Sequence, residues 1–132
     1  MPQAINLTIK NGASTPVDKT FSLVTPAAGD GGIAQWALKE GSISAVFPQF
    51  TASAGKTTNK SRKLTMRLSV PSSYTDAVTG LTNVGSGLLC TWTVSIPQDF
   101  PEAMKDDATA FIVNLTQHPL VKAMIHDAYS AT

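Results

Sequence analysis

The most regular pattern in the sequence is an alternation of apolar and polar residues along positions 63–70. The even positions carry apolar side chains, Leu64, Met66, Leu68 and Val70. The odd positions carry hydroxyls and cations, Lys63, Thr65, Arg67 and Ser69. Residues 89–96 repeat the pattern, with Leu89, Thr91, Thr93 and Ser95 opposite Cys90, Trp92, Val94 and Ile96. Because successive side chains of a strand point to opposite faces, both segments predict strands of an antiparallel sheet with one packed and one polar face.

Shorter patterns before these two segments predict the rest of the sheet. Residues 5–9 alternate and are followed by the turn signal Asn11-Gly12, so with residues 20–24 they predict an N-terminal hairpin within residues 1–28. Runs at 33–38 and 46–54 are further strand candidates in a main sheet over 33–97. The connection at 72–87 is rich in small residues and nearly uncharged, which predicts a long loop.

The last quarter of the chain changes to helical spacing. Asp99, as N-cap, and the proline and acid that follow predict a helix start. Apolar residues then recur at helical spacing, namely Met104, Ala108, Phe111, Ile112 and Leu115. Pro119 breaks this helix and begins another, so 100–131 should form two helices, with His118 at their junction. Strands followed by helices predict an α+β fold in one domain, 1–132, in which a second subunit supplies further helices to cover the sheet.

Composition excludes several classes of protein. The chain has 132 residues, 42% of them hydrophobic and 14% charged, with a net charge of +1, which excludes a disordered chain. No apolar run reaches the roughly 20 residues of a membrane span, and no secretory leader is recognisable, so we expect no membrane partner. The single cysteine, Cys90, excludes an intrachain disulfide and is interpreted as a buried thiol on the apolar side of its strand.

Charge is distributed unevenly along the chain. Residues 41–75 contain no acid but hold half of the ten basic residues, Lys56, Lys60, Arg62, Lys63 and Arg67. Five of the nine acids lie in the final third. A basic stretch of this kind suits a polyanion, and a loop of solvated lysines is an equally good interpretation of the charge alone.

The sequence offers no constellation for catalysis or metal binding. Gly55-Lys56-Thr57 lacks the upstream glycine of a phosphate-binding loop, because that position is Phe50. His118 and His126 are eight residues apart and do not share a helix face. No nucleophile, base and orienting group come together, so we expect no catalytic residue, metal, cofactor or small-molecule substrate.

Several short strings resemble, in the same order, the coat proteins of the single-stranded RNA bacteriophages, the levivirus type. Residues 33–36 resemble the family's Val-Ala-Glu-Trp strand. Residues 62–71 resemble its Arg-Lys-Tyr-Thr-Ile-Lys-Val-Glu-Val-Pro. Residues 95–97 and 118–120 are similar to the family's last strand end and to the start of its C-terminal helix. The similarity extends over almost the whole chain.

This resemblance implies a capsid protein that forms interlocked homodimers. The dimers would self-assemble into an icosahedral shell of T=3 geometry, a virus-like particle, in the cytoplasm of the bacterial host. The polar sheet face would point inward to single-stranded genomic RNA, and the 72–87 loop would make contacts around the symmetry axes. The family also represses replicase translation by binding one operator hairpin.

The resemblance also implies RNA-binding residues. The family's adenine pocket and a further basic contact fall on Ile33, Thr51, Ser53, Thr65, Arg67 and Lys63. The family's stacking tyrosine falls on Leu89, its asparagine on Thr91, and a neighbouring arginine on Gly55. A leucine cannot supply the roughly 1–3 kcal/mol of base stacking that an aromatic side chain gives, so packaging is better supported than recognition of the same hairpin. The alternative, a cellular single-stranded nucleic-acid-binding module, predicts aromatic residues on the polar face, where we find none.

Overall fold

The computed structural model of the chain describes residues 2–58 and 60–132. Its internal contacts divide the chain into two compact units, Met1–Ile96 and Pro97–Thr132. The first unit contains the sheet and the second contains the helices. The single domain expected over 1–132 therefore stays a prediction.

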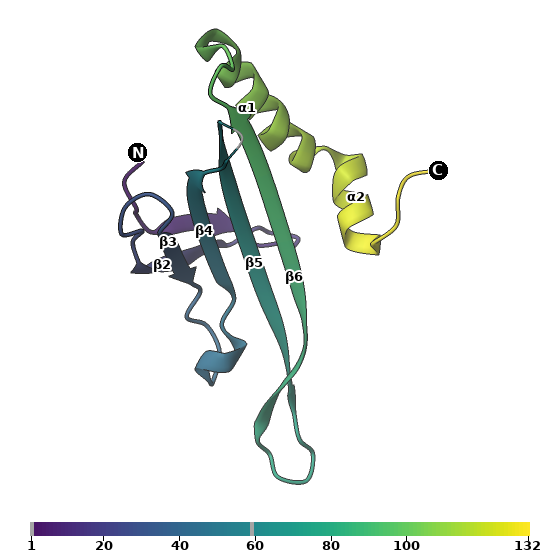
Figure 1. The fold of residues 1–132 in the computed structure, drawn as a ribbon. Coiled ribbons are helices and arrows are strands. Elements are labelled where there is room, and N and C mark those ends of the chain that lie inside the picture. The colour runs from purple at the N-terminus through teal and green to yellow at the C-terminus, as the bar shows by residue number, and fades with distance from the viewer. Residues whose placement is uncertain (1, 59) are drawn as a thin grey trace. The chain divides into compact units, whose positions relative to one another are not determined.

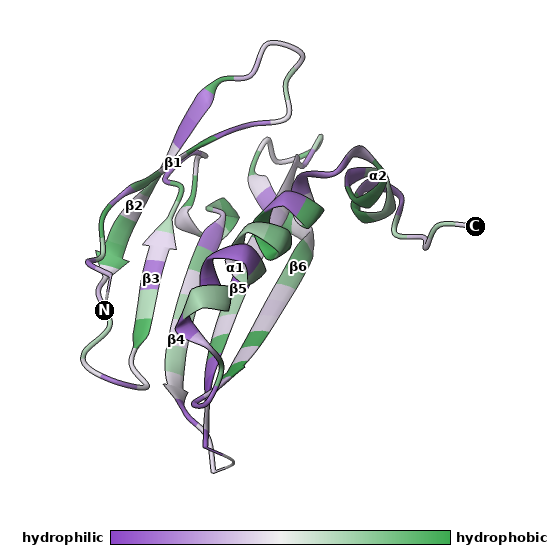
Figure 2. Cartoon of the chain, turned by 90° about the horizontal axis from the view of Figure 1, so that it is seen from above, coloured by the Kyte–Doolittle hydropathy of each residue, from purple (hydrophilic) through white to green (hydrophobic). Residues whose placement is uncertain are grey.

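The first unit is one sheet of six strands whose order in space follows their order in the chain (Figure 1). The strands are β1 (Leu7–Lys10), β2 (Asp18–Thr25), β3 (Ile33–Ala37), β4 (Gln49–Lys56), β5 (Ser61–Thr75) and β6 (Thr82–Pro97). Each pair from β1–β2 to β4–β5 is antiparallel. Hydrophobic and more polar bands alternate along β6 (Figure 2). The predicted antiparallel sheet with an N-terminal hairpin is confirmed.

The connection predicted as a loop at 72–87 is mostly strand. β5 continues to Thr75 and β6 begins at Thr82, so that only residues 76–81 form the turn. Asp76 N donates to Leu81 O at 2.9 Å, and Gly80, at φ +69°, donates to Asp76 O at 2.8 Å. β5 and β6 are hydrogen-bonded neighbours in the sheet, and the Ser72 hydroxyl also donates to Ser86 O across the ribbon. A composition poor in bulky side chains did not prevent this pairing.

The strand predicted at 46–54 begins later than expected. Ser44–Val46 forms a short 3-10 turn, η1, and β4 starts only at Gln49, after Pro48. Val46 is buried, and a side chain at Gly41 (φ +133°) would collide with it. Pro48, which cannot donate a hydrogen bond, still accepts one from Leu38 N at 2.9 Å, which holds the entry to β4.

The core of the first unit is built around Trp36. Its indole Nε1 donates to Ile5 O at 2.7 Å, and its ring centroid lies 5.4 Å from that of Phe50. Phe21, Ala34 and Trp36 are buried together. Partly buried side chains pack around them, namely Ala4, Leu7, Leu23, Ala27, Leu38, Phe50, Ala52 and Leu68. The core therefore covers the apolar face from β2 to the near side of β5.

The second unit consists of α1 (Glu102–Gln117) and α2 (Pro119–Asp127). Asp99, predicted as the N-cap of the first helix, is not in that position, because the helix begins three residues later, after Pro101. An N-cap at Asp99 would place Phe100 in the first turn, and the residue before a proline is disfavoured in helical conformation. Neither helix in the described residues is long and apolar enough to cross a membrane.

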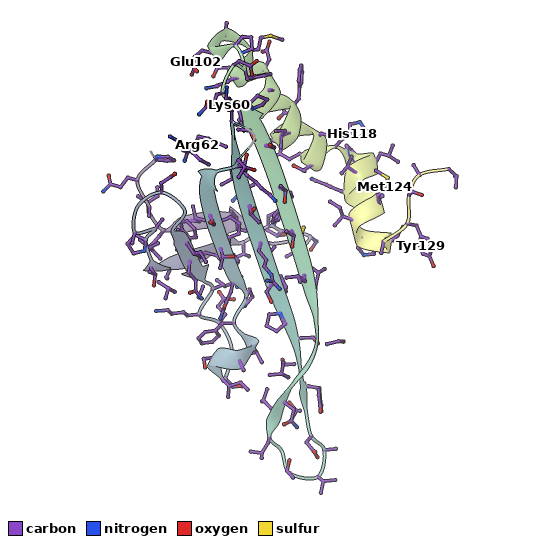
Figure 3. All side chains as sticks on the ribbon, in the orientation of Figure 1. Lys60, Arg62, Glu102, His118, Met124 and Tyr129 are labelled. Carbon is purple, nitrogen blue, oxygen red and sulfur yellow. The ribbon has the colours of Figure 1, made fainter. Side chains whose placement is uncertain are left out.

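His118 occupies the junction of the two helices (Figure 3). Its backbone N–H donates to Leu115 O at 3.2 Å and closes α1. Its Nδ1 accepts from Leu120 N at 3.2 Å and so caps α2, whose first residue is Pro119. The predicted position of His118 is confirmed, and in this position the residue ends α1 and caps α2.

Candidate nucleic-acid interface

The register of the sheet brings most of the predicted RNA-binding residues onto one face. Thr51 of β4 lies opposite Arg67 of β5, and Ser53 lies opposite both Thr65 of β5 and Ile33 of β3. Residues directly opposite each other on antiparallel strands share a face, with Cβ atoms about 4.5–5.5 Å apart. Lys63 joins them opposite Gly55. We call this surface the polar face: Ile33, Gln35, Gln49, Thr51, Ser53, Lys63, Thr65, Arg67 and Ser69.

The two predicted residues of β6 extend the polar face. A Cβ placed on Gly87 would lie 3.3 Å from Pro71 Cα, which sets Pro71 of β5 beside Gly87 of β6. When the pairing of β5 with β6 is counted onward from Pro71 and Gly87 without a bulge, Leu89 lies beside Ser69 and Thr91 lies beside Arg67. Both Leu89 and Thr91 are exposed. All eight residues predicted from the family resemblance therefore lie on one side of four neighbouring strands.

The polar face combines exposed cations with half-buried hydroxyls. Lys63 and Arg67 are exposed, whereas Thr51, Ser53 and Thr65 are partly buried between them. No acidic residue occupies any strand position of this face in β3 to β6. Guanidinium and ammonium groups bind phosphate, and hydroxyls both donate and accept hydrogen bonds. The face can therefore hold a phosphate backbone and the polar edges of bases together.

Two apolar side chains interrupt this polar surface. Ile33 is 60% exposed at one side and Leu89 is 55% exposed at the other. Neither has a π-face, so each can pack against a base only through dispersion and burial of area. The structure thus places a leucine at the position where the family resemblance implies a stacking tyrosine.

The five cations of the basic stretch at 41–75 do not share one surface. Lys56 and Arg62 lie opposite each other in the register, on the alternation that carries Leu64 and Met66 rather than Lys63. Lys60 lies at the turn between β4 and β5, with φ of 54° (Figure 3). Of the five cations, only Lys63 and Arg67 are on the polar face.

One of the cations outside the polar face is neutralised within the chain. The Arg62 guanidinium forms an ion pair with the Asp30 carboxylate, which belongs to the connection before β3. The hydrogen bond from Arg62 is the main cause that lowers the pKa of Asp30, and the charges of Arg62 and Lys56 act in the same direction. The charge that the polar face offers a polyanion is therefore that of Lys63 and Arg67, which is smaller than the total of the basic stretch.

Gln35 and Gln49 belong to the polar face but were missed from sequence. Gln35 lies opposite Thr51, Gln49 lies opposite Ser69, and Gln35 Nε2 donates to Gln49 Oε1 at 3.2 Å. The run 33–38 reads as apolar, so its single amide looked incidental. The signal that could have revealed the pair is the alternation of 33–37, with Gln35 two residues after Ile33.

Metal chemistry has no support among the residues that the structure describes. In 2–58 and 60–132, no three side chains of His, Cys, Asp or Glu come together. Cys90 is partly buried, as a thiol on the apolar alternation of β6. The candidate site is therefore a binding surface of cations, hydroxyls and amides.

The chain is similar to known proteins in sequence and in fold. The chain matches the sequence model of a family described as levivirus coat protein over residues 2–132. Its structure is similar to the virus-like particle of bacteriophage NT-214, with a TM-score of 0.86 and 24% identity over 99% of this chain and 100% of that one. It is also similar to the virus-like particle of Beihai levi-like virus 21, with a TM-score of 0.82 and 19% identity over 99% of both chains. The bacteriophage GA capsid protein gives a TM-score of 0.67 and 21% identity, over 96% of this chain and 95% of that one. No curated protein sequence matched.

Proposed function

Because this chain belongs to the levivirus coat protein family and is a capsid protein rather than an enzyme, we propose that its polar face binds single-stranded RNA inside the shell. One observation supports this proposal above the others. The register places Lys63 and Arg67 on the same face as several hydroxyl and amide side chains, and no acidic side chain lies among them. The cellular nucleic-acid-binding module has no support once the family is known.

The spacing of the polar face suits an extended RNA strand. Neighbouring strands lie about 4.8 Å apart, so Thr51 and Arg67, which are directly opposite each other, are close enough to contact the same nucleotide. Arg67 can hold a phosphate with two parallel hydrogen bonds while the Thr51 and Thr65 hydroxyls contact a sugar or base edge. Such contacts favour packaging of many sequences over selection of one.

We also propose that the functional unit is a homodimer. Both helices carry apolar side chains that are exposed in the single chain, such as Phe111, Leu115, Leu120 and Ile125. β6 is an edge strand of 16 residues, and a long unpaired edge is a template for another strand. A second copy joined along β6 would pair this edge and supply a surface for the helices, as the interlocked dimers implied by the family resemblance do. Closure of such dimers into a T=3 virion shell is part of the same proposal.

Replacing both cations of the polar face tests the RNA proposal. In the Lys63→Ala/Arg67→Ala variant we expect less RNA per purified particle. The dependence of RNA affinity on salt should also weaken, by about 0.7 in log–log slope for each phosphate that the protein no longer neutralises. RNA content comes from the ultraviolet absorbance of the particles, and the slope comes from filter binding with dissociated dimers.

The matched control is Lys39→Ala/Lys56→Ala, which removes the same charge from exposed positions outside the polar face. Equal RNA loss in the two variants would show that only total charge matters, which would contradict a specific role for the face. Unchanged RNA content in Lys63→Ala/Arg67→Ala would reject the face altogether.

A substitution at Leu89 tests whether an operator hairpin, the basis of translational repression, binds the polar face. If the hairpin docks on the polar face, Leu89→Tyr should tighten its binding by about 1–3 kcal/mol, because tyrosine adds a stacking platform for an unpaired loop base. Gel-shift titration with a hairpin carrying an unpaired adenine, and with its fully paired counterpart, measures the gain. The same affinity before and after the substitution would argue against docking at this position.

A further inference from the structure

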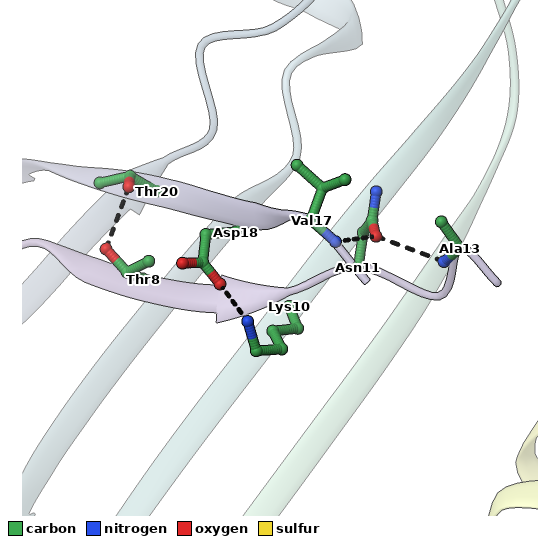
Figure 4. Close-up of polar contacts among 7 residues, drawn as sticks. All are labelled: Thr8, Lys10, Asn11, Ala13, Val17, Asp18 and Thr20. Atoms are coloured by element: carbon green, nitrogen blue, oxygen red, sulfur yellow. Dashed lines mark hydrogen bonds and ion pairs between the residues drawn. The ribbon is translucent and has the colours of Figure 1, made fainter. Parts of the chain in front are cut away.

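The tip of the N-terminal hairpin contains a chemical feature that RNA packaging does not use. The connection between β1 and β2 begins with Asn11-Gly12, the single Asn-Gly step in the sequence. Asn11 N donates to Val17 O at 3.0 Å. The side-chain oxygen Oδ1 of Asn11 accepts from Val17 N at 3.0 Å and from Ala13 N at 3.3 Å (Figure 4). The side-chain amide is therefore held over the turn by two backbone donors.

The strands below the tip hold this arrangement in place. Lys10 Nζ lies 2.7 Å from Asp18 Oδ1, and the Thr8 and Thr20 hydroxyls are 3.0 Å apart (Figure 4). Lys10 and Asp18 are also directly opposite in the register. The turn is thus anchored at its base while its outer residues, including Asn11 and Gly12, are exposed to water.

Gly12 is free to act as a nucleophile through its backbone nitrogen. A Cβ at Gly12 would meet no atom within 4 Å, so nothing crowds this residue. Within the described ranges 2–58 and 60–132, no hydrogen bond engages Gly12 N. Without a side chain, glycine also reaches backbone conformations that bring its nitrogen against the preceding side chain.

We propose that Asn11 is a site of spontaneous deamidation. Gly12 N attacks Asn11 Cγ, a new C–N bond closes a five-membered succinimide, and the Cγ–Nδ2 bond breaks. The nitrogen leaves as ammonia with the proton that Gly12 N gives up. Solvent water then opens the ring at either carbonyl, giving aspartate or isoaspartate. Negative charge develops on Oδ1 during the attack, where the N–H groups of Val17 and Ala13 stabilise it as preorganised donors do.

The two products affect the hairpin differently. Aspartate keeps an oxygen at the position of Oδ1, so Val17 N and Ala13 N still have an acceptor. Isoaspartate adds one atom to the main chain between residues 11 and 12, which displaces the acceptor from Val17 N. Each event also removes one unit from a net charge of +1, so a modified chain is formally neutral, and neutral proteins associate more readily.

The test is an ageing experiment on the purified, assembled protein at mildly alkaline pH. Trypsin releases the segment Asn11–Lys19, and its mass and retention time report conversion to aspartate and isoaspartate. We expect Asn11 to convert about tenfold faster than Asn6, Asn83 and Asn114, which corresponds to a barrier lower by about 1.4 kcal/mol. Asn83 lies in β6 and Asn114 in α1. Isoelectric focusing should show a growing acidic band that migrates with the Asn11→Asp variant.

Gly12→Ala provides the matched control. Gly12 is not among the residues with positive φ, and the space around it is open, so alanine fits without strain. The variant should keep the hairpin and lose the acidic band over the same period. Conversion of Asn11 at the rate of the other asparagines, or equally fast ageing of Gly12→Ala, would overturn the proposal.

Discussion

The region around Trp36 buries its apolar side chains, whereas the two helices leave theirs exposed. Phe21, Ala34 and Trp36 are each less than a tenth exposed inside the first unit. By contrast, neither α1 nor α2 contains a single buried residue, and Phe111 is 72% exposed. Exposed apolar patches on this scale mark interaction surfaces. One part of the chain therefore completes its core alone, while the other is built for a partner.

The largest expected effect comes from breaking the self-contained region at its centre. Trp36→Ala removes the ring that packs on Phe50 and the donor that binds Ile5 O. We expect the free energy of unfolding to fall by about 3–5 kcal/mol, as for other buried aromatic residues. Urea denaturation followed by circular dichroism measures this. A loss below about 1 kcal/mol would mean that the region does not depend on its own core.

A somewhat smaller effect is expected at the helices, and it should have a different character. If a second copy covers α1, Phe111→Ser should weaken the dimer by about 2–4 kcal/mol, the range of a strong interface residue. If α1 faced only water, the same change would cost less than about 0.5 kcal/mol. Analytical ultracentrifugation over a range of concentrations separates the two cases, because dimer stability depends on protein concentration.

Asp107→Ser on the same helix is the control for Phe111→Ser, because it changes an exposed polar residue of α1. It should leave the dimer–monomer equilibrium unchanged. If Phe111→Ser dimerised as strongly as the wild-type chain, the proposal that a second copy covers the apolar residues of α1 would be wrong.

Much of this contrast could be predicted from the sequence, because it depends on local periodicity. The alternation at 63–70 separated Leu64 and Met66 from Lys63 and Thr65, and Pro119 marked the boundary between the helices. Both signals reflect the geometry of one element alone. The structure agrees with them closely.

What could not be predicted depends on pairing between distant segments. The neutralisation of Arg62 by Asp30 and the pairing of Gln35 with Gln49 both join segments that are distant in the sequence. A shift of one residue in the register of β3 and β4 would place Gln35 and Gln49 on opposite faces of the sheet. The family resemblance therefore predicted most residues of the polar face but not Gln35 and Gln49, and the composition did not show that Asp30 neutralises Arg62.

The smallest effect is expected at the Asp30–Arg62 ion pair. It tests whether this pair contributes to the stability of the region that is built around Trp36. This pair ties the connection before β3 to the start of β5, and Gly31 N of the same connection donates to Ala54 O of β4 at 2.8 Å. Arg62 lowers the pKa of Asp30 below its usual value of about 3.9. The stabilisation is therefore fully present above that usual value and is lost as the pH falls through the lower pKa of the folded state.

Asp30→Asn should then be slightly less stable than the parent chain at neutral pH and equally stable in strong acid. The effect should be small because both side chains remain largely in contact with water, 47% and 44% exposed. Thermal unfolding of both proteins across the acid range measures it, and Asp30→Asn/Arg62→Gln should show no further loss if the two groups act only through each other. A stability difference that persists in strong acid would show that Asp30 acts through something other than its charge. The ion pair with Arg62 would then not be the source of the stabilisation.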